Sequence, residues 1–127
     1  MTFVLVRKRH VVAEDRRRGI VPIYEHVLLN PGDFAGASMA DAALGRAVVV
    51  LVRGLGLVAA HGGVVSRGAT ALATADGLNL TWDALVEGLR DRAGTGPCPF
   101  EAATAFCWTS EQALSALAAA LGRMRAG

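Results

Sequence analysis

The chain has 127 residues, a length that fits a single domain, 1–127, built around one hydrophobic core. Apolar residues make up 53% of it and aromatic residues only 6%, which predicts an interior of Ala, Val and Leu and favours helices packed on a sheet over an all-β barrel. The formal net charge of +2 is too small for a long-range field that attracts nucleic acid, so nucleic acid is not an expected partner.

The cysteine content and the hydropathy of the sequence indicate in which cellular compartment the protein is expected. Cys98 and Cys107 do not make a disulfide framework, and no secretory leader opens the sequence, so we expect a cytoplasmic protein. The longest apolar stretch, 42–63, is interrupted by Arg46 and Arg53, so we expect no membrane partner. The three histidines and two cysteines have no paired ligand spacing, so we expect no metal and no other cofactor.

A β-hairpin and a helix open the chain. Residues 2–6 and 10–13 are β-branched or apolar runs on either side of a polar turn, which predicts a hairpin. Pro22 suits the first turn of a helix that runs to Leu29, because an N–H there is unpaired anyway. The arginine clusters at 7–9 and 16–18 could contact an RNA backbone, but they lack aromatic residues for base stacking, so we interpret them as solvated segments.

The middle of the chain alternates predicted helices and strands. Ser38 followed by Asp41 resembles a capping box and predicts a helix over 38–52 that is buried nearly all round. A core strand is expected at 57–60, with an extension over 64–65. Gly54-Leu55-Gly56 precedes this strand and lacks a third glycine, so it is not a dinucleotide-binding loop.

Four further helices are predicted after this strand. Ser66 is expected to cap a helix over 67–75 that Gly77 ends, and a short strand follows at 78–80. Thr81 is expected to cap a helix over 82–91. Pro99 begins a short helix toward Phe106, and the Thr109 and Gln112 pair opens a final helix with apolar residues at helical spacing.

The loop over 91–101 gathers a guanidinium, a flexible Gly-Thr-Gly segment, a thiol and a carboxylate. Cys98 stands at the start of a predicted helix, where the helix field and Arg92 would both lower the pKa of the thiol, and Glu101 could accept its proton. The alternative is structural, because Glu101 suits a capping position and the flanking prolines fix the direction of the chain. We favour the structural interpretation.

Several short motifs occur in a fixed order between Phe3 and Leu121: Arg18-Gly19-Ile20 with Pro22, Gly36-Ala37-Ser38-Met39-Ala40-Asp41 with Gly45, Val65-Ser66, and Gly94-Thr95-Gly96 with Cys98-Pro99 and Glu101. With these motifs the chain resembles an uncharacterised prokaryotic domain-of-unknown-function family that has a cytidine deaminase-like fold but lacks the zinc site. The resemblance implies a three-layer α/β/α fold whose mixed central sheet is opened by an N-terminal β-hairpin and flanked by helices.

The resemblance also implies a pocket that faces the N-termini of helices beginning near Ser38 and Ser66. Zinc deaminases carry His or Cys ligands and a catalytic Glu there, and the motifs of this chain supply neither ligand set, so zinc-dependent deamination is not expected. The leading hypothesis is a domain that binds a small polar or anionic molecule, of the nucleoside or nucleotide kind, in the former active-site cleft. The candidate ligand-binding residues are Arg18, Ser38, Asp41, Ser66, Thr95 and Cys98.

Two other hypotheses remain open. In the first, the protein is an enzyme that uses Cys98 as a nucleophile or redox thiol, with Glu101 and Arg92 as the further catalytic residues. In the second, the protein is an interaction module that self-associates through a sheet edge or its Leu/Ala-rich helices. A homo-oligomer is expected in either case, because deaminase folds often assemble.

Overall fold

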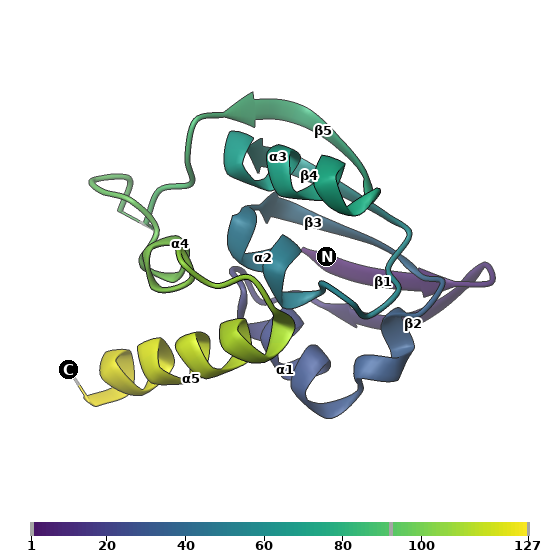
Figure 1. Ribbon diagram of the computed structural model, residues 1–127, viewed down its shortest axis with the longest axis horizontal. Helices are drawn as coiled ribbons and strands as arrows, with labels where there is room; N and C mark the ends of the chain where they lie inside the picture. The colour runs from purple at the N-terminus through teal and green to yellow at the C-terminus, as the bar shows by residue number, and fades with distance from the viewer. Residues whose placement is uncertain (1, 92, 127) are drawn as a thin grey trace.

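A five-stranded mixed sheet organises the computed structural model, which describes residues 2–91 and 93–126 (Figure 1). The strands lie in the order β2-β1-β3-β4-β5. β1 is antiparallel to both of its neighbours, whereas β3, β4 and β5 are parallel to one another. Their bounds are β1 Phe3–Arg7, β2 His10–Asp15, β3 Ser38–Leu44, β4 Ala59–Ser66 and β5 Asn79–Val86.

The helices connect the strands and pack on the sheet. They are α1 Val21–Leu29, the 3-10 helix η1 Pro31–Phe34, α2 Arg46–Leu51, α3 Arg67–Asp76, α4 Pro99–Ala103 and α5 Ser110–Ala126. The short helix α2 contacts β3, α3 and α5, and every residue over 47–51 is buried. The helical side of the sheet is therefore two layers deep at α2, with α5 outermost (Figure 1). No described helix is long and apolar enough to cross a membrane.

The side of the sheet opposite the helices is open. Along β3, Met39 and Asp41 are buried on the helical side, whereas Ser38, Ala40 and Ala42 on the other side are exposed. The same alternation continues on the neighbouring strands, because residues paired across strands share a face. Within the described residues the helices therefore cover one face, and the expected three-layer arrangement with helices on both faces is not found. The outward side chains of β3 are too small to require a second helical layer.

One cluster of buried apolar side chains fills the space between the sheet and the helices. Its largest fully buried members come from strands, from α1 and α2, from η1 and from α5, so the core joins distant parts of the chain: Phe3, Leu5, Ile23, Phe34, Leu44, Leu51 and Leu117. The Ala- and Val-rich α2 supplies five consecutive buried residues, which confirms the expected interior.

Several local predictions are confirmed. The hairpin forms from β1 and β2, and α1 carries Pro22 in its first turn. The hydroxyl of Ser66 accepts a hydrogen bond from the Ala69 N–H (3.3 Å) and caps α3, which Gly77 ends at a φ of +70°. α4 begins at Pro99, and the final helix begins after Thr109, whose hydroxyl accepts a hydrogen bond from the Gln112 N–H (3.1 Å).

The predicted helix over 38–52 is wrong in its first half. Residues 38–44 form β3, and only 46–51 are helical. Ser38 is therefore a strand residue on the open face and not a helix cap. The alternation of Met39 and Asp41 with small outward residues suits a strand between β1 and β4, and this pairing outweighs the capping-box signal.

The predicted helix over 82–91 is also wrong, because β5 continues to Val86 and an irregular loop follows. Parallel pairing with β4 over its whole length outweighs the helical spacing of the apolar residues in this segment. β4 likewise runs past Gly62 and Gly63. A Cβ on Gly63 would lie 2.8 Å from the carbonyl oxygen of Ala42, so the glycine permits the close approach of β3 and β4.

Candidate functional site

The three parallel strands end at one edge of the sheet, where α2 and α3 begin. Ligands of open α/β sheets commonly bind at this carboxyl edge. Here the start of α2 is occupied by the chain itself, because the carboxylate of Glu101 accepts hydrogen bonds from the N–H groups of Arg46 (2.8 Å) and Ala47 (2.7 Å). Glu101 comes from α4 and caps a helix that lies far from it in the sequence.

Gly45 makes room for this contact. A Cβ at Gly45 would overlap the carboxylate of Glu101 and would lie 2.8 Å from a methyl group of Leu89. The absent side chain therefore lets the carboxylate reach the first N–H groups of α2. Burial raises the pKa of Glu101 above its ordinary value, while the two N–H groups and the Arg46 charge act in the opposite direction.

Arg46 fixes the segment that carries Glu101. Its guanidinium donates to the carbonyl oxygens of Thr104 and Cys107, each at 2.8 Å, and lies 5.0 Å from the centre of the Trp108 ring. Backbone N–H groups, a carboxylate and a stacked guanidinium thus join α2 to the segment 101–108. We call this set of contacts, made by Gly45, Arg46, Ala47 and Glu101, the closed end.

Asp41 is a second buried carboxyl group, on the inner face of β3. It is 9% exposed, and its Oδ1 accepts a hydrogen bond from the Ala42 N–H at 2.7 Å. Burial raises the pKa of Asp41 to about 7. The sequence grouped Asp41 with Ser38, but the two side chains lie on opposite faces of the sheet.

The other predicted ligand-binding residues are dispersed. Ser38 pairs with Ala59 at the start of β4, whereas Ser66 lies seven residues farther along that strand, which is roughly 23 Å. The hydroxyl and N–H of Thr95 both donate to Asp91 and close a turn of the loop. The structure therefore does not bring Ser38 next to Ser66, and the cleft expected between them does not form.

Cys98 occupies the position before the first turn of α4 and is half-buried. Its N–H donates to the carbonyl oxygen of Leu89 (3.0 Å). Each oxygen of Glu101 accepts a hydrogen bond from the start of α2, so the carboxylate is held there. Arg92 lies outside the described residues. The described residues hold no group of three or more His, Cys, Asp or Glu side chains that could bind a metal.

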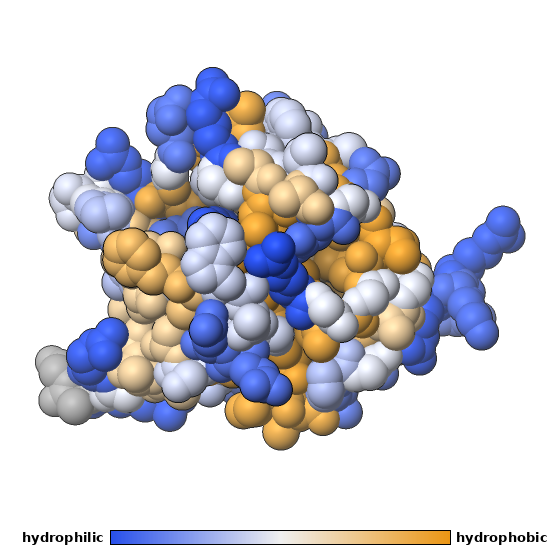
Figure 2. All heavy atoms as spheres, in the orientation of Figure 1, coloured by the Kyte–Doolittle hydropathy of each residue, from blue (hydrophilic) through white to orange (hydrophobic). Residues whose placement is uncertain are grey.

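The opposite edge of the parallel strands holds a cavity of about 430 Å³. Figure 2 shows this region as an orange hollow bordered by blue side chains between α2 and α3. We call it the Arg53 cavity. Its polar members are Arg53, Asp76, Gly54 and Gly56, and its apolar members are Val49, Val52, Leu57 and Leu78.

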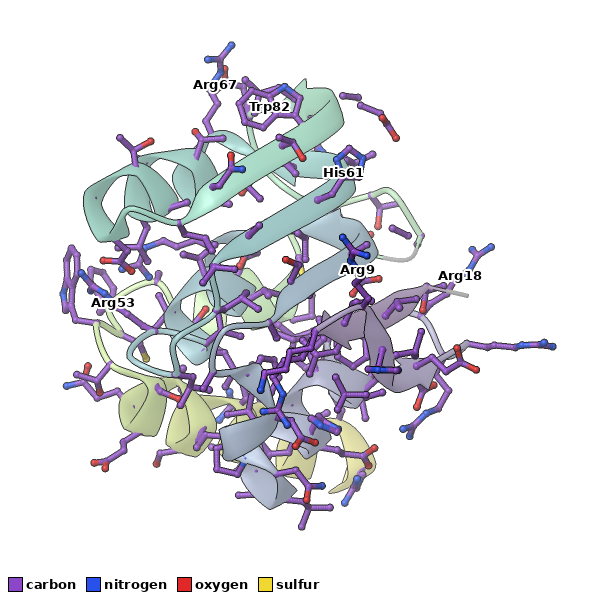
Figure 3. The ribbon with its side chains drawn as sticks, turned by 90° about the vertical axis from the view of Figure 1, so that its right-hand side faces the viewer. Arg9, Arg18, Arg53, His61, Arg67 and Trp82 are labelled. Atoms are coloured by element: carbon purple, nitrogen blue, oxygen red, sulfur yellow. The ribbon has the colours of Figure 1, made fainter. Side chains whose placement is uncertain are left out.

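Arg53 is held at this cavity by two partners and is labelled in Figure 3. Its Nε and Nη2 lie 3.0 and 2.9 Å from Oδ1 of Asp76, at the last residue of α3. Its Nη1 donates to the carbonyl oxygen of Trp108 at 2.9 Å. The Arg53 side chain is 30% exposed, so it is partly accessible to solvent.

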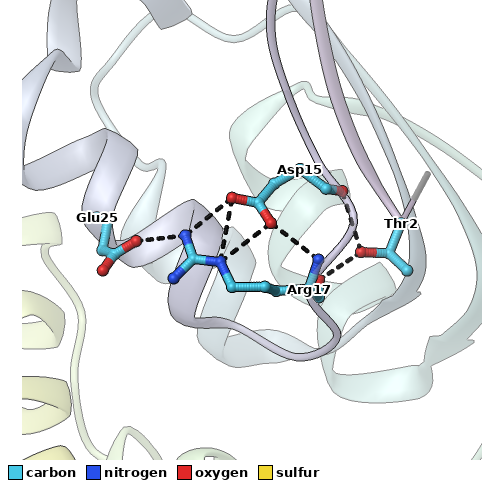
Figure 4. A network of polar contacts seen from close by, with 4 residues as sticks. All are labelled: Thr2, Asp15, Arg17 and Glu25. Carbon is cyan, nitrogen blue, oxygen red and sulfur yellow. Dashed lines mark hydrogen bonds and ion pairs between the residues drawn. The ribbon is translucent and has the colours of Figure 1, made fainter.

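A third polar cluster surrounds Arg17 (Figure 4). Arg17 pairs with Asp15 (2.8 Å) and Glu25 (2.6 Å), and the Thr2 hydroxyl donates to the Arg17 carbonyl oxygen. Hydrogen bonds from Arg17 lower the pKa of Asp15 to about 2. The cluster joins β2 to α1 beside a smaller cavity of about 200 Å³, and its charges are mutually paired.

The family model described as TM1506, domain of unknown function (DUF1893), matches residues 1–120. The chain belongs to this family. The crystal structure of a DUF1893 family protein (TM1506) from Thermotoga maritima matches with a TM-score of 0.82 and 19% sequence identity. The match covers 93% of this chain and 79% of that chain, and at this identity it shows a shared fold alone. No curated protein matches the chain.

The main features of this DUF1893 domain that the sequence did not reveal are Arg53 and the closed end. In the sequence, Arg53 was noted only because it interrupts the apolar stretch 42–63, and Gly54-Leu55-Gly56 only because it is not a dinucleotide-binding loop. An arginine beside two glycines at the end of a helix could have indicated the site. No local pattern could have joined Glu101 to Arg46, because the contact spans 55 residues. The resemblance to a deaminase directed attention to the carboxyl edge, which this chain fills with its own side chain.

Proposed function

We propose that this DUF1893 domain binds a small molecule with an anionic group in the Arg53 cavity. The observation that carries the proposal is the contrast between the two edges of the sheet. The carboxyl edge at α2 is filled by Glu101, whereas the amino edge offers about 430 Å³ of space beside an arginine. Small-molecule sites commonly combine such a concave apolar surface with a few polar groups.

The polar groups of the cavity suit a carboxylate or a phosphate. Two of the five N–H groups of Arg53 donate hydrogen bonds, to Asp76 and to the Trp108 carbonyl oxygen, and Nη2 lies within ion-pair distance of Asp76, so N–H groups remain for a ligand. The N–H groups of Gly54 and Gly56 donate to no other residue within 2–91 and 93–126, so they are available as well. Arginine with adjacent backbone N–H groups is a common arrangement for anion recognition.

The apolar members of the cavity suit a planar or aliphatic portion of the same ligand. Val49, Val52, Leu57 and Leu78 offer branched aliphatic side chains without hydrogen-bonding groups. A nucleotide-like molecule has both parts, a ring for the apolar side and a phosphate for Arg53. This proposal keeps the ligand class that the resemblance suggested and moves its position to the opposite edge of the sheet.

The deaminase-like fold remains part of this proposal. A mixed sheet opened by a hairpin, with helices that begin directly after β3 and β4, supports it. The open sheet face argues for a reduced version of that architecture. The enzymatic alternative through Cys98 has less support, because Glu101 is occupied in capping α2.

Binding is tested by calorimetric titration with nucleoside monophosphates, the matching nucleosides, and small mono- and dicarboxylates. We expect at least one anionic compound to bind and to raise the melting temperature, because a ligand of the native state stabilises it. Arg53→Gln should weaken that binding at least tenfold, as expected for the loss of about 1.5–3 kcal/mol from a charged hydrogen bond.

Arg67→Gln is the matched control, because Arg67 also pairs with an acidic residue, Glu87, but at the opposite end of α3. The control should bind the compound with unchanged affinity. If no anionic compound binds, or if both variants lose binding equally, the Arg53 cavity is not the ligand site. Binding that survives Arg53→Gln and disappears in Ser66→Ala would return the site to the carboxyl edge.

A further inference from the structure

Positive charge is concentrated at the β1–β2 hairpin. Residues 7–18 hold six of the 13 Lys and Arg residues of the chain but only two of its 11 Asp and Glu residues. The remainder of the chain is therefore net acidic, although the whole chain is slightly basic. Figure 2 shows hydrophilic side chains projecting from the right of the molecule, where Figure 1 places the hairpin turn.

The hairpin turn presents its cations in an unfavourable backbone conformation. Lys8 and Arg9 form the two-residue turn and have φ values of +52° and +66°. Turns of this kind favour Asn-Gly, because residues with a Cβ are strained in the left-handed region. If turn formation alone had selected these two residues, Asn and Gly would be expected in place of Lys8 and Arg9.

A second pair of cations follows at the other end of β2. Arg16 and Arg18 are separated from the turn by the six residues of the strand, which span roughly 20 Å. None of Lys8, Arg9, Arg16 and Arg18 forms an ion pair within the described part of the chain, whereas Arg17 is paired with Asp15 and Glu25. A small anion cannot contact both ends of the strand at once, but an extended polyanion can.

The open sheet face lies next to these cations. Figure 3 shows Arg9, Arg18 and His61 on the right of the sheet, with α3 on its left. The centre of the open face is flat, because Ala40, Ala42 and Gly63 carry little or no side chain. His61 places an imidazole ring on this surface, and its Nδ1 lies 2.7 Å from the Thr81 hydroxyl.

We propose that the hairpin cations Lys8, Arg9, Arg16 and Arg18 form a contact surface for the phosphate backbone of a nucleic acid, which lies along the open sheet face. Arginine and lysine neutralise phosphates without regard to base sequence. The small net charge of the whole chain argued against nucleic acid, but the uneven distribution of charge makes the hairpin and the segment after it strongly basic. The charge complementarity favours a nucleic acid over a two-fold symmetric contact with a second copy of the chain, in which the same cations would face each other.

The test measures binding of fluorescent 20-nucleotide single strands and 20-base-pair duplexes by anisotropy over a salt series. We expect binding at low salt, with log K falling linearly against log salt. The double variant Lys8→Asn/Arg9→Gly removes two charges and supplies the residues that the turn prefers. It should bind about tenfold more weakly, with a salt slope smaller by about 1.4–1.8 for two lost phosphate contacts. Its thermal stability should be equal or higher, which separates loss of charge from loss of fold.

Arg123→Gln/Arg125→Gln is the matched control, because it removes the same charge from the last turn of α5. The control should keep its affinity and its salt slope. The proposal is overturned if neither nucleic acid binds at low salt, or if both double variants lose affinity equally. Tighter binding to phosphatidylserine vesicles than to either oligonucleotide, with the same dependence on Lys8 and Arg9, would replace the nucleic acid with a lipid surface.

Discussion

The two edges of the parallel strands differ in what occupies them. At the carboxyl edge, Gly45 leaves space at the start of α2, and the carboxylate of Glu101 fills it. At the amino edge, a cavity lined by Gly54 and Gly56 near the end of α2 stays open beside Arg53. The same topology therefore closes one edge and opens the other, so the position of a site within a fold does not by itself tell whether the site is available.

Among substitutions in the closed end, a change at Gly45 is expected to have the largest effect on stability. Gly45→Ala places a Cβ where the Glu101 carboxylate lies, so either the carboxylate leaves α2 or the backbone moves. We expect a loss of about 3 kcal/mol in the free energy of unfolding, from steric strain and the lost cap together. Urea denaturation measures it.

Gly68→Ala provides the control for this substitution. A Cβ on Gly68 would meet the Arg46 side chain at an ordinary 3.6 Å, and Gly68 lies in the first turn of α3. We expect this variant to be as stable as the parent chain or more stable by about 0.5 kcal/mol, because alanine favours the helix. Equal destabilisation by the two variants would contradict the closed end as the specific cause.

Asp41 is a buried carboxyl group that, unlike Glu101, forms no helix cap. The dependence of stability on pH can therefore be compared between the two groups. The pKa of Asp41 is raised from 3.8 to about 7 in the folded chain, so the folded state holds the proton more tightly than the unfolded state. The contribution of Asp41 to the free energy of unfolding is therefore fully present below pH 4 and is lost as pH rises through 7. This loss amounts to about 2–4 kcal/mol.

Asp41→Asn removes the titrating group and keeps an oxygen for the Ala42 N–H. We expect the variant to be more stable than the parent chain at pH 8 and to show a weaker dependence on pH between 4 and 8 than the parent chain. Thermal unfolding at a series of pH values measures both effects. A parent chain whose stability rises over this range, in parallel with that of the variant, would contradict the assignment.

The smallest expected effect concerns the charge of Glu101. Glu101→Gln keeps one oxygen acceptor but places an NH₂ group near the second N–H of α2, so one donor is left without a partner. We expect a loss of about 1–2 kcal/mol. Glu111→Gln, in the exposed first turn of α5, should cost less than about 0.5 kcal/mol under the same conditions. Similar losses in both variants would show that the cap contributes no more than an exposed charge.

Part of the candidate site was within reach of sequence reasoning. Ser66 was recognised as a helix cap, and its hydroxyl caps α3. Glu101 was expected to be a capping residue of its own helix, whereas its carboxylate caps α2. The helix that Glu101 caps was not predictable, because capping signals are read from neighbouring residues and α2 lies 54 residues before it. The Arg53 cavity also depends on α2 and α3 packing side by side, which no single segment specifies.

The sequence by itself determined the elements whose signals are local. The β1–β2 hairpin, the start of α1 at Pro22, the Ser66 and Gly77 bounds of α3 and the onset of α5 each follow from a few adjacent residues. Tertiary structure alone decided that 38–44 and the part of β5 after residue 80 are strands, because their apolar spacing suits a helix or a strand and only pairing with β4 selects one. It also decided which face of the sheet stays open and which edge is closed, since both depend on contacts between segments that meet only after folding.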